Sequence, residues 1–251
     1  MSSGGSFVHY EIAGSGLPII LLHGIGSNAR SWRRQLAAFS AAYQVIVWDA
    51  PGFGKSEDLP GQVPSIRVFA DSLKGLMNSL GLKSAVVLGH SLGGLIAQEF
   101  YRTYPQSVRA LILADTTQGR SGNLEERLRM IRTMSPQQLA RERAPKLLSK
   151  NAAPELVEEA IAIMSEVRRP GYEFAAIAMA SADMRGVLDN MQVPLLMIWG
   201  VEDQITPLWP AWPASARVEL IPNAGHLCYA EQPDVFNAAV LDFLRFSTPE
   251  A

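Results

Sequence analysis

The sequence lacks the features that mark several large classes of protein. Its 251 residues include one cysteine, Cys228, so no disulfide can form within the chain, which is typical of a reducing compartment. Lysine and arginine number 22 against 24 acidic residues, for a net charge of −2. A chain without a basic excess is a poor partner for nucleic acid or an anionic membrane.

The sequence also has no long apolar run, and its first residues do not predict a leader. No apolar stretch approaches the roughly 18 residues of a membrane span, and "MSSGGSFVHY" at the start has neither a basic nor an apolar region typical of a signal peptide. We therefore expect a soluble cytoplasmic protein, monomer or homodimer, that acts on a small molecule without nucleic acid or a membrane as partner.

What the chain does have is a regular alternation of two patterns. Short apolar runs bounded by turn residues occur at 18–24, 43–49, 84–90, 108–115, 193–200 and 216–222. Such runs predict strands buried on both faces, and residues 6–14 predict an edge strand. Apolar residues at helical spacing fill 29–41, 65–80, 92–103 and 233–246. The alternation predicts an α/β fold with a mostly parallel central sheet flanked by helices.

One long segment breaks this alternation. Residues 119–186 carry helical patterns and charge, but no strand-like run, between the fourth and fifth of the six buried strands. Long insertions in compact domains are more often functional than not. We expect a core domain of residues 1–118 and 187–251, with 119–186 inserted as a helical cap. The alternative is that these helices merely complete the core.

A serine stands at one of the predicted strand-to-helix turns. Gly89-His90-Ser91-Leu92-Gly93 fits G-x-S-x-G, directly after a buried run and before a helical segment. In that context the serine is lifted above the sheet on a strained turn, where only glycine fits at the two outer positions. The alternative is a chance match in a glycine-rich turn. The pattern predicts that Ser91 is a nucleophile.

A serine nucleophile needs a base and an acid that orients the base. Of the four histidines, His226 lies in a loop after the last predicted strand, where it can reach over Ser91. Asp203 follows the strand at 193–200, and Asp115 ends the strand at 108–115. The chain order serine, aspartate, histidine favours Asp203 as the acid, with Asp115 as the alternative.

The oxyanion formed by serine attack needs two backbone donors. The N–H group of Leu92, directly after the nucleophile, is one candidate. Ile25 in the loop "HGIGSNARSW" is the other, because Gly24 and Gly26 allow its backbone a close approach. We expect Gly24 to lie at the substrate. No metal or organic cofactor is expected, because His, Asp and Glu show no metal-ligand spacing and no phosphate-binding loop is present.

Together these motifs resemble the α/β-hydrolase fold family. The matching features are His23-Gly24, "DAPGFGKS" at 49–56, the serine turn at 89–94, Gly200…Asp203…Pro207, and Gly225-His226. Residues 171–207 and 221–244 look most like 3-oxoadipate enol-lactonases and related carboxylesterases. The resemblance implies a serine hydrolase that cleaves carboxylic ester or lactone bonds of small, partly apolar substrates through an acyl-enzyme on Ser91.

Two alternatives to that function stay open. The 49–56 loop also resembles the meta-cleavage-product C–C hydrolases of aromatic catabolism, which typically carry asparagine before the nucleophile and an aromatic residue after the histidine. Here His90 and Leu227 stand in those places. The third hypothesis is a non-catalytic ligand receptor on the same fold, although a pure binder has no need to keep serine, aspartate and histidine together.

Two adjacent arginines are candidates for substrate binding. Arg168 and Arg169 precede Pro170 inside the inserted segment. An inward-facing guanidinium can hold a substrate carboxylate with two hydrogen bonds. The alternative is two solvated charges at the end of a helix.

Overall fold

The protein is built around one twisted sheet. The computed structural model describes residues 7–119, 123–189 and 191–247. The seven strands are β1 (Tyr10–Ala13), β2 (Pro18–Leu22), β3 (Gln44–Trp48), β4 (Ala85–His90), β5 (Val108–Ala114), β6 (Leu195–Gly200) and β7 (Ala216–Ile221). Their order in the sheet is β1-β3-β2-β4-β5-β6-β7. β1 pairs antiparallel with β3, and the other neighbouring strands pair in parallel. The predicted mostly parallel sheet is confirmed.

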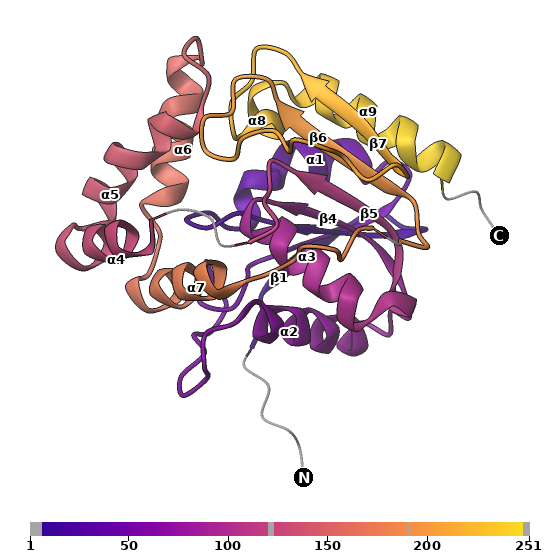
Figure 1. Ribbon diagram of the computed structural model, residues 1–251, viewed down its shortest axis with the longest axis horizontal. Coiled ribbons are helices and arrows are strands. Elements are labelled where there is room, and N and C mark those ends of the chain that lie inside the picture. The colour runs from indigo at the N-terminus through magenta and orange to yellow at the C-terminus, as the bar shows by residue number, and fades with distance from the viewer. Residues whose placement is uncertain (1–6, 120–122, 190, 248–251) are drawn as a thin grey trace.

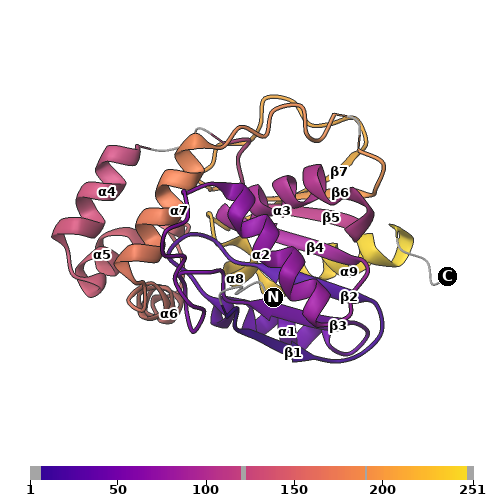
Figure 2. The ribbon, with the colours of Figure 1, turned by 90° about the horizontal axis from the view of Figure 1, so that it is seen from below.

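Helices cover both faces of this sheet (Figures 1 and 2). One face carries α2 (Ile66–Ser79) and α3 (Leu92–Thr103), and the other carries α1 (Arg33–Phe39), α8 (Cys228–Glu231) and α9 (Pro233–Ser247). Short 3₁₀ turns are η1 (Ala29–Trp32), η2 (Pro105–Ser107) and η3 (Ala144–Leu147).

The two cores meet at the sheet. In β2, Ile20 and Leu22 pack with the α2 and α3 side, while Ile19 and Leu21 pack with the α1 and α9 side. All four are fully buried. Successive strand residues point to opposite faces, so a strand covered on both faces must be apolar at every position. That requirement explains the unbroken apolar runs of the sequence.

A second group of helices lies beyond the carboxyl ends of the parallel strands (Figures 1 and 2). These are α4 (Leu124–Thr133), α5 (Pro136–Arg143), α6 (Pro154–Met164) and α7 (Arg169–Ser181). The chain leaves and rejoins the core at one place, where Gly119 bridges Asp183 and the Met184 N–H donates to Gln118 O at 2.7 Å. The helical character predicted for residues 119–186 is therefore observed over the part of that segment that the structure describes.

Ion pairs tie these helices to the core. Glu159 on α6 accepts hydrogen bonds from Arg34 at 2.8 and 2.9 Å and from Arg33 at 2.8 Å. Arg168, just before α7, pairs with Asp58 at 3.0 Å. None of the described helices has the length and apolar character that crossing a membrane requires.

Candidate active site

Ser91 occupies a strained turn between β4 and α3. Its backbone has φ 52° and ψ −113°, a region that costs a non-glycine residue on the order of 1–3 kcal/mol and persists only where the surroundings enforce it. The neighbouring glycines do so. A Cβ at Gly93 would lie 2.1 Å from Leu22 O, and one at Gly89 would lie 2.2 Å from Gly93 O. The strand turns into a helix at this point only because both residues lack a side chain.

His226 and Asp203 form a buried pair near this turn. Asp203 follows β6 and His226 follows β7. The His226 Nδ1 lies 2.9 Å from Asp203 Oδ2, and His226 is 3% exposed. Ser91 and His226 line the same cavity. The fold thus brings the three residues expected from the sequence together at the carboxyl ends of β4, β6 and β7.

The hydrogen bonds around Asp203 favour its charged form. Burial works against ionisation, but bonds from His226 and Thr206 and from the Ile205 N–H outweigh it, so the pKa of Asp203 is lowered. The Ile205 N–H lies 2.7 Å from Oδ1, and the Thr206 hydroxyl donates to Oδ2. An ionised carboxylate that accepts from His226 Nδ1 leaves the other ring nitrogen free to accept a proton, as a serine base requires.

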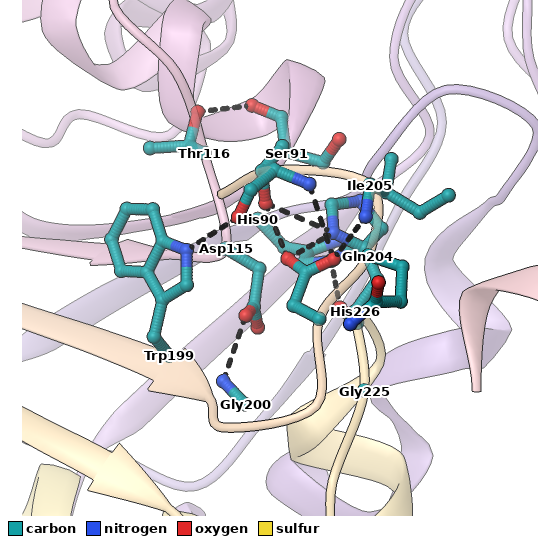
Figure 3. A network of polar contacts seen from close by, with 12 residues as sticks. His90, Ser91, Asp115, Thr116, Trp199, Gly200, Gln204, Ile205, Gly225 and His226 are labelled. Carbon is teal, nitrogen blue, oxygen red and sulfur yellow. Dashed lines mark hydrogen bonds and ion pairs between the residues drawn. The ribbon is translucent and has the colours of Figure 1, made fainter. Parts of the chain in front are cut away.

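Asp115, the alternative acid, does a different task. It follows β5 with φ 41° and is fully buried. Its Oδ1 accepts the Gly200 N–H at 2.9 Å (Figure 3). Burial raises its pKa well above the ordinary value, and the charge of Asp203 adds to the shift. Asp115 therefore favours the neutral form and anchors the start of the loop that carries Asp203.

Asp115, Asp203 and His226 are also the residues that could be considered for a metal. Their ligand atoms lie within 4.8 Å of one another. The donor set argues against that use, because the Asp203 oxygens already accept from two backbone N–H groups, a hydroxyl and an imidazole. A neutral Asp115 is in addition a weak ligand for a cation. These groups fit a carboxylate–imidazole pair better than a metal centre.

His90 contacts both the backbone and the ring of His226. Its Nε2 lies 2.7 Å from His226 O, and the two rings lie 4.7 Å apart. Burial lowers the pKa of His90 well below its usual value, and the nearby His226 adds to this. A neutral His90 that donates from Nε2 therefore fixes the backbone of His226.

The loop after β2 lies directly against the serine turn. A Cβ at Gly24 would lie 2.8 Å from His90 Nδ1 and 3.2 Å from Ser91 Cβ. Gly24 and Ile25 both line the cavity. Because Leu92 is the first residue of α3, its N–H group has no carbonyl partner within the helix. The two expected oxyanion donors thus belong to segments that flank Ser91.

The cavity above Ser91 has a floor and a roof. It opens to solvent, and the space among its lining residues, solvent included, amounts to about 750 Å³. We call the floor the lining residues of the α/β core, among them Gly24, Ile25, Ser91 and His226. We call the roof the lining residues of the α4–α6 region, which are Arg127, Arg143, Leu147, Leu156, Glu159, Ala160, Ile163 and Met164.

The placement expected for Arg168 and Arg169 is wrong, because neither lines this cavity. The Arg168 guanidinium binds Ser56 O at 2.6 Å, Gly54 O and Asp58. That of Arg169 binds Ile131 O at 3.1 Å and Arg132 O at 3.0 Å. Both side chains are held by backbone carbonyls outside the site, since guanidinium donors satisfy several carbonyls at once.

Sequence reasoning missed the arginines that do line the cavity, Arg127 and Arg143. A signal for them exists in the helical spacing. Arg127 lies on one helical face with Leu124, Leu128 and Ile131, and Arg143 lies three and four residues after Ala140 and Leu139. An arginine in a position where an amphipathic helix needs an apolar residue points to a buried role.

The sequence of the chain matches the Alpha/beta hydrolase family over residues 19–239. The protein is therefore a member of the alpha/beta hydrolase family, and the family resemblance seen in the motifs is confirmed. Its fold belongs with those of known esterases and lactonases.

Individual relatives match nearly the whole length of the chain. A putative carbamate hydrolase, RutD, of Azorhizobium caulinodans is 30% identical over 259 residues, 96% of each chain. A 2-hydroxy-6-oxo-6-phenylhexa-2,4-dienoate hydrolase of Comamonas testosteroni is 29% identical, over 95% of this chain and 91% of its own.

Two solved structures resemble the whole fold. A thermophilic esterase of Thermogutta terrifontis, malate bound, is 30% identical with a TM-score of 0.90, over 99% of this chain and 97% of its own. An enol-lactonase of Burkholderia xenovorans LB400 is 27% identical with a TM-score of 0.87, over 96% of this chain and 97% of its own.

Proposed function

We propose that this hydrolase cleaves carboxylic ester or lactone bonds of small, partly apolar substrates through an acyl-enzyme on Ser91. The observation that carries the proposal is the buried Asp203–His226 pair, 2.9 Å between Nδ1 and Oδ2, whose histidine lines the same cavity as a serine on a strained turn. A serine hydroxyl is a weak nucleophile by itself and needs such a base.

In the first half of the reaction, Ser91 Oγ attacks the substrate carbonyl and His226 Nε2 takes the hydroxyl proton. Asp203 keeps the proton of His226 on Nδ1 and stabilises the imidazolium that forms. The Ile25 and Leu92 N–H groups bind the oxyanion. When the tetrahedral intermediate collapses, the C–O bond to the leaving group breaks, and His226 gives its proton to the leaving alkoxide.

In the second half, His226 removes a proton from water, and the hydroxide attacks the acyl carbonyl. Collapse breaks the bond to Ser91 Oγ, which recovers its proton from His226, and the carboxylic acid is released. Every proton moves between water, substrate, Ser91 and His226, so the cycle needs no cofactor.

The α4–α7 helices act in this proposal as the cap that selects the substrate. Most of the roof is apolar, with Leu156, Ala160, Ile163 and Met164 facing the cavity. An apolar roof removes water from around the reacting groups and strengthens their electrostatic interactions. The likeness to an esterase and to an enol-lactonase supports the ester or lactone class.

C–C bond hydrolysis of meta-cleavage products is the second candidate. The likeness to the Comamonas dienoate hydrolase favours it. The same serine and base can serve that reaction, so the triad does not separate the two. His90 stands where those enzymes typically carry asparagine, and its ring is already bonded to the His226 backbone, which supports the ester or lactone reaction first.

The test is covalent labelling followed by nucleophile replacement. A fluorophosphonate probe should label the wild-type protein and should not label Ser91→Ala. That variant should keep its fold and lose turnover by about 10⁴-fold or more. A folded wild-type protein that is not labelled and hydrolyses no substrate would overturn the proposal in favour of a ligand receptor.

A substrate panel then separates the hydrolase classes. p-Nitrophenyl esters, enol-lactones, aryl carbamates and vinylogous 1,5-diketones are compared by kcat/KM on one preparation. Esters or lactones should be turned over fastest. Activity confined to the diketone would reverse the order of the two candidates.

A further inference from the structure

We infer that Arg127 and Arg143 in the roof form a carboxylate-binding site, so that the substrate of this enzyme is an acidic ester or lactone. The inference rests on the proposed hydrolase function and specifies its substrate class. It places the anion site on α4 and at the end of α5, away from Arg168 and Arg169.

Arg127 is a partly buried cation without an acidic partner. In the described part of the chain its guanidinium has one hydrogen bond, to the Met179 sulfur at 3.6 Å, and a thioether is a weak acceptor. Burial lowers the pKa of Arg127; the Tyr172 hydroxyl opposes this shift, while the positive charge of Arg143 contributes to it. Arg127 is thus desolvated without compensation from a carboxylate.

Arg143 lines the same cavity and, among the described residues, likewise has no acid bonded to its guanidinium. Its charge acts on Glu126 and Glu142 without a bond: Arg129 is the main cause of the lowered pKa of Glu126 and Lys146 of that of Glu142, and Arg143 adds to both shifts. Within residues 7–119, 123–189 and 191–247, no ion pair or hydrogen bond involves its guanidinium. The nearby acid on α4, Glu126, is held by Arg129 through two bonds of 2.7 and 2.8 Å. Glu142, next to Arg143 in the chain, pairs with Lys146. The neighbouring acids therefore already have other partners.

The acidic residue in the cavity lining, Glu159, is also already paired. Glu159 is part of the roof, but both of its oxygens accept hydrogen bonds from Arg33 and Arg34 on α1. The cavity therefore presents two like charges beside apolar side chains. Two arginines that repel each other in a partly desolvated site are stabilised when an anion enters between them.

A carboxylate is the anion that fits a hydrolase of this kind. Guanidinium groups bind carboxylates with paired, directional hydrogen bonds. A substrate held this way carries its acid group at the roof and its ester or lactone carbonyl at Ser91. Hydrolysis makes a second carboxylate, so the product is a dicarboxylate or a hydroxy acid.

The test compares two esters that differ only in one charge. p-Nitrophenyl hydrogen glutarate carries a free carboxylate, and p-nitrophenyl methyl glutarate carries a methyl ester in its place. The wild-type enzyme should prefer the acid by at least about 10-fold in kcat/KM. Arg127→Gln and Arg143→Gln should each lower kcat/KM for the acid by about 10- to 100-fold, mainly through KM, and change the methyl ester by less than about 3-fold.

Matched controls come from the same helices. Arg132→Gln on α4 and Arg141→Gln on α5 remove exposed arginines that do not line the cavity, and both should leave the two substrates unchanged. A wild-type enzyme without preference for the acid would overturn the inference. So would an equal loss on both substrates in the Arg127 and Arg143 variants, which indicates a structural role.

A binding measurement separates this inference from the proposed function. Glutarate is titrated calorimetrically into Ser91→Ala, and into Ser91→Ala combined with Arg127→Gln. Heat of binding in the first and its loss in the second supports the anion site even if the wild-type enzyme cleaves neither ester. Equal binding by both proteins, or no binding by either, contradicts the anion site while leaving the nucleophile assignment intact.

Discussion

The floor and the roof of the cavity are built in different ways. Floor residues lie at strand ends or in short loops of the central sheet, and Ser91, His90 and His226 are 7%, 2% and 3% exposed. Neighbouring backbone and side-chain groups hold each of them. The roof stands on separate helices that reach the core through side-chain bridges such as Glu159 with Arg33 and Arg34.

This difference separates two tasks of one site. The floor carries groups whose geometry must not vary, because a displacement of about 1 Å can cost on the order of 10²-fold in rate. The roof carries the arginines that we propose to recognise a substrate, and it is tied to the core by exposed or partly buried ion pairs, of which the exposed ones contribute little individually. We expect changes in the floor to affect every substrate alike and changes in the roof to affect substrates selectively.

The largest expected effect concerns the two aspartates that lie next to the floor in the α/β core, Asp203 and Asp115. Asp203→Asn should lower kcat by about 10⁴-fold on neutral and acidic esters alike, because the wrong tautomer of His226 is then favoured. Asp115→Asn keeps an oxygen for the Gly200 N–H and should lower kcat by less than about 10-fold. Steady-state kinetics on both glutarate esters checks this pair.

The relative losses of kcat in Asp203→Asn and Asp115→Asn decide which aspartate is the acid of the triad. A larger loss in Asp115→Asn would make Asp115 the acid of the triad. A loss in Asp203→Asn that is confined to the acidic ester would contradict the separation of floor from roof, since Asp203 would then act on selectivity.

Sequence reasoning predicted where Ser91, Asp203 and His226 lie because strand ends leave little freedom. Apolar runs locate the strands, parallel strands end at one edge, and G-x-S-x-G marks the strand-to-helix turn. The order of Ser91, Asp203 and His226 along the chain then agrees with one geometry. What the sequence did not reveal is the network around these residues, such as His90 bonded to His226 O, because it depends on side-chain orientation.

Sequence reasoning failed for the roof because helix orientation decides there which arginine faces inward. The segment 123–169 contains several arginines with similar neighbours, and the pair Arg168 and Arg169 stands out only by adjacency. Their guanidinium groups bind carbonyls outside the cavity. The position of each arginine around the helix axis would have been a better guide, since Arg127 shares its helical face with Leu124 and Ile131.

An intermediate effect is expected at Arg168, which lies just before α7 and binds the α/β core. Arg168→Ala removes bonds to Gly54 O, Ser56 O and Asp58 and should lower the free energy of unfolding by about 1–3 kcal/mol. Arg168→Lys should recover only part of this, because one ammonium cannot reproduce the fork of a guanidinium. Urea unfolding measures the effect.

Its control is Arg185→Ala, which removes an exposed arginine paired with Asp183 and should change stability by less than about 0.5 kcal/mol. Arg168→Ala should also keep its kcat on the neutral ester within about 3-fold. A selective loss on the acidic ester in Arg168→Ala would return the carboxylate site to this arginine and count against Arg127 and Arg143.

The smallest expected effect is a pH-dependent gain of stability in Asp115→Asn. The folded protein holds the proton of Asp115 because burial and the charge of Asp203 raise its pKa. An unfolded carboxyl releases that proton above pH about 4, so the wild-type protein loses stability as pH rises from there through the raised pKa. Asp115→Asn cannot ionise and escapes this loss. Its Tm should exceed that of the wild type by about 2–4 °C at pH 7.5.

The pH dependence of this difference distinguishes titration from packing. The gain in Tm should shrink toward zero near pH 4, where Asp115 is protonated in both folded and unfolded protein. Asp203 has the opposite sign: its pKa is lowered, so the stability that it contributes is lost as pH falls through that lowered value. Calorimetry of Asp115→Asn and the wild type between pH 4 and 8 therefore isolates the effect of Asp115, because both proteins keep Asp203. A gain in Tm that is constant with pH would mean that Asp115 acts through packing alone. Of the two aspartates, Asp203 would then be the one whose charge matters to the site.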